Sequence, residues 1–414
     1  SPEIRFGKFG LGMDLELFLT DKGNLSSRGW EFSTLQQTLD SLTRKLNYIR
    51  WNQKDNVVYG KDNLYFRFGT IQNFTLGQGL IMKGYANTIN FPAEKNFGLE
   101  LALGNITPLK LGFEGVVNSL ADLSRNGFLF GGRIFTTPLA ATQIPVFNKL
   151  QIGASYAGDI NQFASLKDSD GDGVPDGVDR FPSNKAASNY SATQLSALSN
   201  YYVAFDQTNG VDWAALAKTP PSTLYQNDYF GMWGMDMTLP LAPWFRIYGQ
   251  FAITHDPSQF GIDTTEAKGW GIAAPAVWFK VLNILEFQAE FRRQEGYFQS
   301  GYFDRRYDAA RAVYVNGNSI LTRDNALSNY SASGFYAGLN LNLFVVILNA
   351  SYEQLFKDNT ATPKGSLDAK VYLNPELLAK VPVLKKMVGQ AEAYFIKQRV
   401  DSLDTFLAMN ETVT

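Results

Sequence analysis

Alternation of apolar and polar side chains over long segments constrains the fold of this chain more than any other feature of its sequence. The clearest segment is 285–292, which reads LEFQAEFR. The same alternation recurs in segments 99–103, 109–114, 245–253, 339–343 and 346–353. Because successive side chains of a β-strand point to opposite faces of the sheet, each segment predicts a strand with one apolar and one polar face.

The lengths of the segments and of their connections favour a membrane barrel over a soluble β-sandwich, which also alternates. Strands of soluble proteins average about 5–6 residues, whereas membrane-spanning strands need about 9–11. The longer class is reached by segments 4–19, 229–239, 244–254 and 285–297. Short connections alternate with long ones, as in outer-membrane barrels; the short ones include 105–108 and 240–243, and the long ones 118–127, 255–267 and 299–333.

Aromatic residues gather near the ends of the expected strands, where amphipathic rings favour a membrane–water interface. They are Tyr229, Phe230, Trp233, Trp244, Trp270, Trp278, Phe298 and Phe356. In alternation, strand length, loop rhythm and aromatic placement, most of the chain resembles the porin-like class of outer-membrane β-barrels from Gram-negative bacteria. The resemblance implies an all-β fold: a closed antiparallel transmembrane β-barrel of about 14–16 strands with long extracellular loops, formed by residues 1–414 as one unit in the cell outer membrane.

Two further strands and two helices are expected in other parts of the chain. The strands are segments 58–69 and 75–84. In 34–49, leucines and an isoleucine recur at spacings of three and four residues, which predicts a helix. A second helix is predicted over 375–388, where Pro382 should kink or break it. We expect these two short amphipathic helices to rest on the barrel; the alternatives are that they plug the interior, lie at the membrane interface, or cover a surface for a partner.

Composition excludes several classes. The net charge is −2, from 37 basic and 39 acidic residues, so the chain lacks the excess of positive charge that is typical of nucleic-acid-binding proteins. The absence of cysteine excludes disulfides, thiolate metal sites and cysteine nucleophiles. No apolar run approaches the ~18 residues that a spanning helix needs. No signal peptide is visible at Ser1, and we expect a mature chain from which one was removed.

The most specific motif is an acidic loop at 168–182, within the expected extracellular insertion 159–228. Carboxylates stand at positions 1, 3, 5, 9 and 12 of this loop, and Gly173 at position 6 permits a sharp turn, as in calcium loops. The stretch resembles a thrombospondin type 3 repeat, although it is single and lacks cysteine. The resemblance implies a bound Ca²⁺; the expected ligands are Asp168, Asp170, Asp172, the carbonyl of Val174, Asp176 and Asp179. The alternative is a solvated acidic turn.

The polar faces of the strands predict a hydrophilic interior. The expected pore-lining residues are Lys110, Glu114, Arg133, Arg246, Glu286, Glu290 and Arg292. The arginines opposite the glutamates would set a field across the opening of a porin-like channel for small hydrophilic solutes. The expected partners are membrane lipids and such solutes, with a homo-oligomer or an outer-membrane protein partner left open. The alternative is a plugged barrel that serves as a structural or docking component of an outer-membrane complex.

No catalytic arrangement emerges from the sequence. The single histidine, His255, is followed by Asp256 and Ser258, but no nucleophile motif accompanies them, so an outer-membrane phospholipase is disfavoured. Glu286 and Glu290 belong to one face of one strand, whereas a glycosidase needs its carboxylates across a cleft. We therefore predict a protein that is not an enzyme.

Overall fold

A computed structural model provides the coordinates of the chain. The structure describes residues 3–13, 33–34, 45–89, 95–120, 122, 127–171, 174–177, 179, 183, 228–257, 266–282, 284–315, 319–343, 345–358, 363–373 and 392–398. Within these residues, no helix combines the length and apolar character needed to cross a membrane. The predicted helix over 375–388, the first part of that over 34–49 and most of the insertion 159–228 lie outside them.

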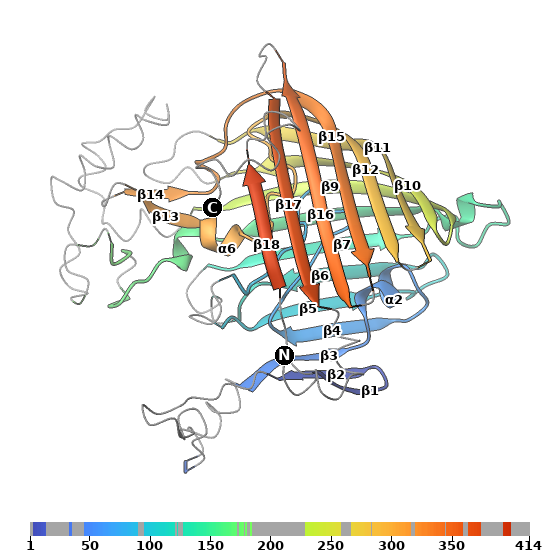
Figure 1. Cartoon of the computed structure of the whole chain (residues 1–414), viewed down its shortest axis with the longest axis horizontal. Helices are drawn as coiled ribbons and strands as arrows, with labels where there is room; N and C mark the ends of the chain where they lie inside the picture. The colour runs from blue at the N-terminus through green and yellow to red at the C-terminus, as the bar shows by residue number, and fades with distance from the viewer. Residues whose placement is uncertain are drawn as a thin grey trace.

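The described residues form one 16-stranded sheet in which every pair of neighbours is antiparallel, so the all-β expectation is confirmed (Figure 1). Strand order follows chain order, except that a separate hairpin, β13 (Ala312–Val315) and β14 (Ser319–Thr322), is inserted between β12 and β15. The sheet strands are β1 (Glu3–Phe6), β2 (Phe9–Met13), β3 (Leu46–Trp51), β4 (Leu64–Gly69), β5 (Gly98–Leu103), β6 (Gly112–Val117), β7 (Leu129–Thr136), β8 (Gln151–Asp159), β9 (Phe230–Ala242), β10 (Phe245–His255), β11 (Gly269–Val281), β12 (Leu285–Gly296), β15 (Ala332–Asn342), β16 (Val346–Lys357), β17 (Pro363–Leu373) and β18 (Glu392–Gln398).

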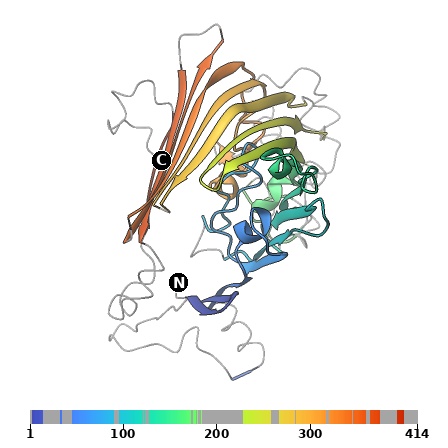
Figure 2. The same ribbon diagram turned by 90° about the vertical axis from the view of Figure 1, so that its right-hand side faces the viewer.

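The sheet is strongly curved, and its first and last strands are two open edges (Figure 2). Along the described part of the chain, no pairing joins β1 to β18. Long and short connections alternate between β8 and β16, as the sequence predicts, but not between β6 and β8 or after β16. β9 and β10 follow one another almost directly, for example, whereas residues 256–268 connect β10 to β11.

Two predicted strands are wrong, and the helix predicted over 34–49 is wrong over its last four residues. Segment 4–19 begins as a tight hairpin, β1–β2, because Gly7 has a φ of 58° and turns the chain. Residues 46–49 belong to strand β3, where Ile49 is paired with Leu11 and Phe68 on its two neighbours. Their helical spacing is therefore overruled by sheet pairing. The sequence also missed the short helix α2 (Lys54–Val58).

The third wrong prediction is the strand over 75–84. Gly77, Gly79 and Gly84 have φ values of 59°, 97° and 64°, which L side chains rarely adopt, and they fold this segment back on itself. The Leu76 N–H donates to the Met82 carbonyl, and Phe74 and Tyr85 exchange two backbone hydrogen bonds. The segment therefore forms a compact loop instead of a seventeenth strand of the sheet.

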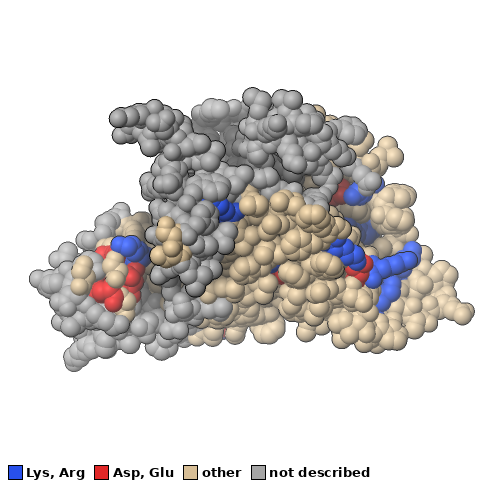
Figure 3. Space-filling view, turned by 90° about the horizontal axis from the view of Figure 1, so that it is seen from below, with Lys and Arg blue, Asp and Glu red and all other residues tan. Residues whose placement is uncertain are grey.

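The two faces of the sheet differ as the alternation predicts. On β9, the outward side chains Trp233, Met235 and Met237 are exposed, Met235 to 68%. The inward side chains between them include Asp236 and Thr238, which are buried. The surface in Figure 3 accordingly has a broad area with few charged side chains (Figure 3).

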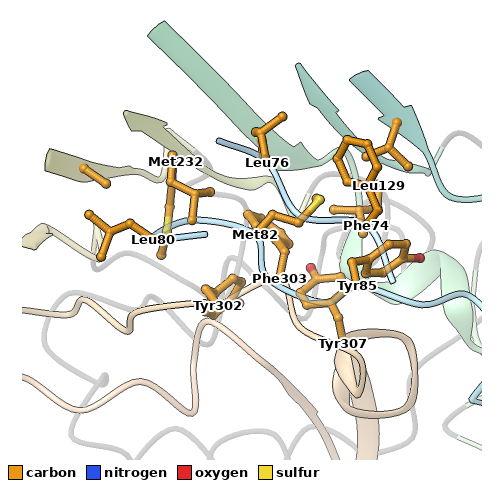
Figure 4. Packing of buried hydrophobic residues seen from close by; sticks show 14 of the residues in the cluster. Phe74, Leu76, Leu80, Met82, Tyr85, Leu129, Met232, Tyr302, Phe303 and Tyr307 are labelled. Atoms are coloured by element: carbon orange, nitrogen blue, oxygen red, sulfur yellow. The ribbon is translucent and has the colours of Figure 1, made fainter. Parts of the chain in front are cut away.

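Two segments fill much of the concave face; we call residues 71–87 and 298–311 the inner segments. Their backbones join where the Lys83 N–H donates to the Phe303 carbonyl and the Gly301 N–H donates to the Leu80 carbonyl. Their apolar side chains pack with inward side chains of the strands, including Leu129 and Met232 (Figure 4). From the inner segments this buried core includes Phe74, Leu76, Leu80, Met82, Tyr85, Phe298, Tyr302, Phe303 and Tyr307.

Candidate functional site

A buried ion network lies beneath the first inner segment. Arg133, on β7, is fully buried and donates from Nε and Nη2 to the two carboxylate oxygens of Asp236, both at 2.7 Å. Its Nη1 donates to Glu114 at 3.1 Å. Glu114 also pairs with Lys54 of α2 at 3.0 Å and accepts the Gly77 N–H. These charges compensate one another and anchor the inner segment to the sheet.

A second network crosses strands β10, β12, β15 and β16. The Arg292 guanidinium pairs with Glu290 at 2.6 Å and with Glu353. Its central carbon lies 3.9 Å from the ring centre of Tyr336. The Tyr248 hydroxyl donates to Glu290 at 2.8 Å. Glu290 is therefore satisfied within the protein, whereas Arg292 and Glu353 border a cavity.

A third network ties the second inner segment to the sheet. Arg311 donates from Nε and Nη2 to Asp159 of β8, each at 2.5 Å, and the Tyr307 hydroxyl donates to the same carboxylate at 2.8 Å. Asp308, in the short helix α6 (Tyr307–Ala310), accepts hydrogen bonds from the Tyr85 hydroxyl. Burial raises the pKa of Asp308 to about 7, against the opposing effects of Arg311 and Tyr85. Burial likewise raises the pKa of Tyr85.

A polar cavity of about 660 Å³ lies between the inner segments and strands β10–β17. Six basic and four acidic side chains line it. Arg246 stacks over Trp278 and Tyr59, with its guanidinium carbon 3.7 Å and 4.6 Å from the ring centres. Lys83 donates to Gln288 at 3.1 Å and lies 3.9 Å from the ring centre of Tyr336. Aromatic rings and amides, rather than carboxylates, thus hold these two cations.

The seven predicted pore-lining residues divide into three groups. Arg246, Glu286 and Arg292 line the cavity. Glu114, Arg133 and Glu290 lie on the inward face but are buried within the ion networks. Lys110 differs from the prediction, because the turn between β5 and β6 places it in the left-handed region, with a φ of 52°, and leaves it exposed. Since Arg133 and Arg292 pair directly with glutamates, the predicted field across the opening largely cancels.

Several cavity residues escaped the sequence analysis because they lie in loops without strand alternation. They are Tyr59, Lys83, Asp304, Arg305 and Arg306. The run Asp304-Arg305-Arg306 is an uninterrupted charge cluster within a long loop, and that cluster is the one signal that could have drawn attention to the loop. Nothing in the local pattern around Tyr59 or Lys83 indicates that either side chain faces the interior.

The acidic loop is only partly described, since Asp172 and Gly173 lie outside the described residues. Asp168 accepts the Gly171 N–H at 2.8 Å, and Gly171 has a φ of 72°. Asp176 accepts two hydrogen bonds from Ser169, and these lower the pKa of its carboxyl. Within the described part of the chain, no group of three or more His, Cys, Asp or Glu side chains could hold a metal ion. The oxygen donors present are of the type that calcium prefers.

Outward aromatic side chains form two bands at opposite ends of the strands. One band includes Tyr156 and Trp233, whose ring centres lie 4.2 Å apart. His255 packs against this band, 6.2 Å from Tyr156, so it is part of an aromatic cluster. The other band includes Phe279 and Phe287, 5.0 Å apart. Ser258, the nearest candidate nucleophile in sequence, lies outside the described residues.

Comparisons with protein-family models, with curated proteins and with solved structures found no match. The function therefore has to be argued from the geometry of this chain.

Proposed function

We propose that this chain closes into a β-barrel in a bacterial outer membrane and passes small hydrophilic solutes along the polar half of its interior. The observation that carries the proposal is the opposite character of the two sheet faces. Apolar side chains such as Met235, Ile134 and Phe335 stay exposed on the outside, where lipid tails would cover them. Their inward neighbours include the buried, ion-paired Arg133 and Asp236.

The cavity supplies the route. A space of about 660 Å³ is large enough for a small organic solute, and its lining is rich in charged and amide side chains. The inner segments pack against β6–β9 and fill the interior there. Next to β10–β17 the cavity stays open. A channel of this form is narrower than an unobstructed 16-stranded barrel, which leaves an aqueous channel.

Purified protein reconstituted in planar bilayers tests the proposal. We expect stepwise conductance, together with a shift in gel migration between unheated and heated samples that indicates a detergent-resistant fold. A heat-modifiable protein without conductance steps would contradict the channel.

The absence of conductance steps would favour a second candidate function, a sealed barrel that acts as a structural or docking component. The observation in its favour is the extent to which the inner segments fill the interior with apolar contacts and buried ion networks. Copurification of a stable outer-membrane partner, with no conductance from the complex, would support it.

We also propose that the acidic loop binds Ca²⁺ through Asp168, Asp170, Asp172, Asp176, Asp179 and the Val174 carbonyl. Extracellular calcium modules typically bind at about 10⁻⁴–10⁻³ M, so millimolar calcium is the relevant range. Calorimetric titration should show saturable binding that Asp170→Asn weakens at least tenfold. Asp304→Asn, which also replaces an aspartate but outside the loop, should leave calcium binding unchanged. Equal binding by both variants would contradict the assignment.

A further inference from the structure

The charges in the cavity indicate which solutes it accepts. Six basic and four acidic side chains give its lining an excess of two positive charges. We propose that the cavity binds a small organic solute through an oxyanion group, a carboxylate or a phosphate, held by Arg246 and Lys83. This inference deepens the proposed function by naming the chemical class of the solute.

Three of the acidic side chains of the cavity already have basic partners. Glu286 pairs with Lys280 at 2.7 Å, and Glu353 pairs with Arg292. Asp304 accepts a hydrogen bond from Arg323 at 3.0 Å. The fourth, Asp368, lies in the electrostatic field of Arg305, Arg306 and Lys370. A cationic solute would have to displace these partners.

Arg246 is differently placed. Across the described residues it makes no ion pair, and its Nε is buried without a hydrogen-bond partner. Its contacts are the ring faces of Trp278 and Tyr59. Stacking keeps the charge of a guanidinium while its N–H groups, which lie in the plane of the group, stay available for a bidentate contact with a carboxylate or phosphate.

Lys83 extends the same patch. Its ammonium group holds the Gln288 amide oxygen and the ring face of Tyr336, which leaves donor capacity. Arg292 pairs with both Glu290 and Glu353, and Lys83 interacts electrostatically with Glu290, so these two cations and two carboxylates balance one another. Lys83 therefore contributes donor groups to the site, while Arg246 contributes a positive charge that no carboxylate of the described residues pairs with.

Sheet register brings the two cations to one part of the interior. Arg246 is paired with Trp278, and Trp278 with Gln288, the residue that Lys83 contacts. The next two strands add Asn340 and Asn349, which are paired with one another and line the same cavity. Amide groups at this position can hydrogen-bond hydroxyl or amide groups of the solute, so we infer a small, polar organic anion.

Calorimetric titration of the folded protein in detergent, with inorganic phosphate and separately with succinate, tests the inference. We expect saturable binding of at least one anion and at least a tenfold increase in Kd for Lys83→Gln and for Arg246→Gln. Lys110→Gln makes the same charge change in an exposed turn and should stay within twofold of the parent. Binding of one probe alone identifies phosphate or carboxylate as the preferred oxyanion. No binding of either anion, or equal weakening by Lys110→Gln, would overturn the inference.

Two further measurements separate this inference from folding defects and from the channel proposal. Lys83→Arg keeps the charge and should keep anion binding within a few-fold, and gel migration reports whether each variant folds. In a salt gradient across a bilayer, the reversal potential should show anion preference, which Lys83→Gln reduces. Anion binding without conductance would contradict the channel proposal but support this inference. Cation-selective conductance without anion binding would support the channel proposal but contradict this inference.

Discussion

Arg133 is the side chain whose loss should destabilise the protein most, because it neutralises Asp236 and Glu114 where water is excluded. Removing one member of a buried ion pair typically costs about 3–5 kcal/mol, and we expect this loss in the free energy of unfolding for Arg133→Met. Arg293→Met is the matched control, since Arg293 pairs with the partly exposed Glu295 and Asp358. An exposed pair contributes about 0–1 kcal/mol. Urea unfolding of both variants should separate them, and equal losses would show that the Arg133 network is not a stability determinant.

Asp308 should make the inner segments sensitive to pH. Its pKa is about 7 in the folded protein, against an ordinary value of 3.8, so the folded state binds more protons between these values. Stability of the inner segments should therefore fall as the pH rises from about 4 to about 7, and level off above that range. Asp308→Asn should remove this slope, as measured by protease cleavage of the inner segments from pH 5 to 8. A slope that persists unchanged in Asp308→Asn would exclude Asp308 as its origin.

At the scale of elements, the inner segments depend on apolar packing as well as on ion networks. Met82 is fully buried in the apolar cluster that also contains Leu129 and Tyr302 (Figure 4). Truncating a buried methionine to alanine costs about 2–5 kcal/mol. We expect Met82→Ala to loosen the first inner segment. The channel conductance should then be larger than in the parent protein, or fluctuate between levels. Met235→Ala removes the same atoms from the exposed outer face and should change neither conductance nor protease sensitivity. Identical behaviour of the two variants would mean that the inner segments do not restrict the opening.

The outer wall of the molecule was more predictable from sequence than its interior. Alternation over residues 285–292 identifies β12 because its apolar side chains lie on one face of the sheet and its polar side chains on the other, which is a local and periodic constraint. Residues 75–84 have a strand-like composition, but three glycines with positive φ and contacts with residues 298–307 decide their path. Such contacts join segments more than two hundred positions apart, so no local pattern could indicate them. The burial of Arg133 likewise depends on the inner segment that covers it, and the exposure of Lys110 depends on the conformation of the turn in which it lies.

In the sheet as a whole, the sixteen strands formed by the described residues follow an unbroken antiparallel order, and this order has a geometric consequence. With an even number of strands, the first and last run in opposite directions, and they can pair in the same antiparallel manner as all their neighbours. Closure would also remove two exposed strand edges, which otherwise favour aggregation. Figure 2 shows that the sheet is curved, which closure requires.

Engineered disulfides can test closure directly, because the chain has no cysteine of its own. We expect cysteine at position 4 of β1, combined in turn with cysteine at positions 394–397 of β18, to form a disulfide in at least one combination. The bond requires Cα atoms about 4.4–6.8 Å apart, a distance that only paired strands provide. The crosslink closes a loop of nearly the whole chain, so the denatured, unreduced protein should migrate faster on a gel. Cysteine at position 251 of β10, combined with position 4, is the control and should give no crosslink. If no combination crosslinks in protein extracted from membranes, the edges stay apart and the barrel proposal fails, because an open edge cannot be exposed to lipid.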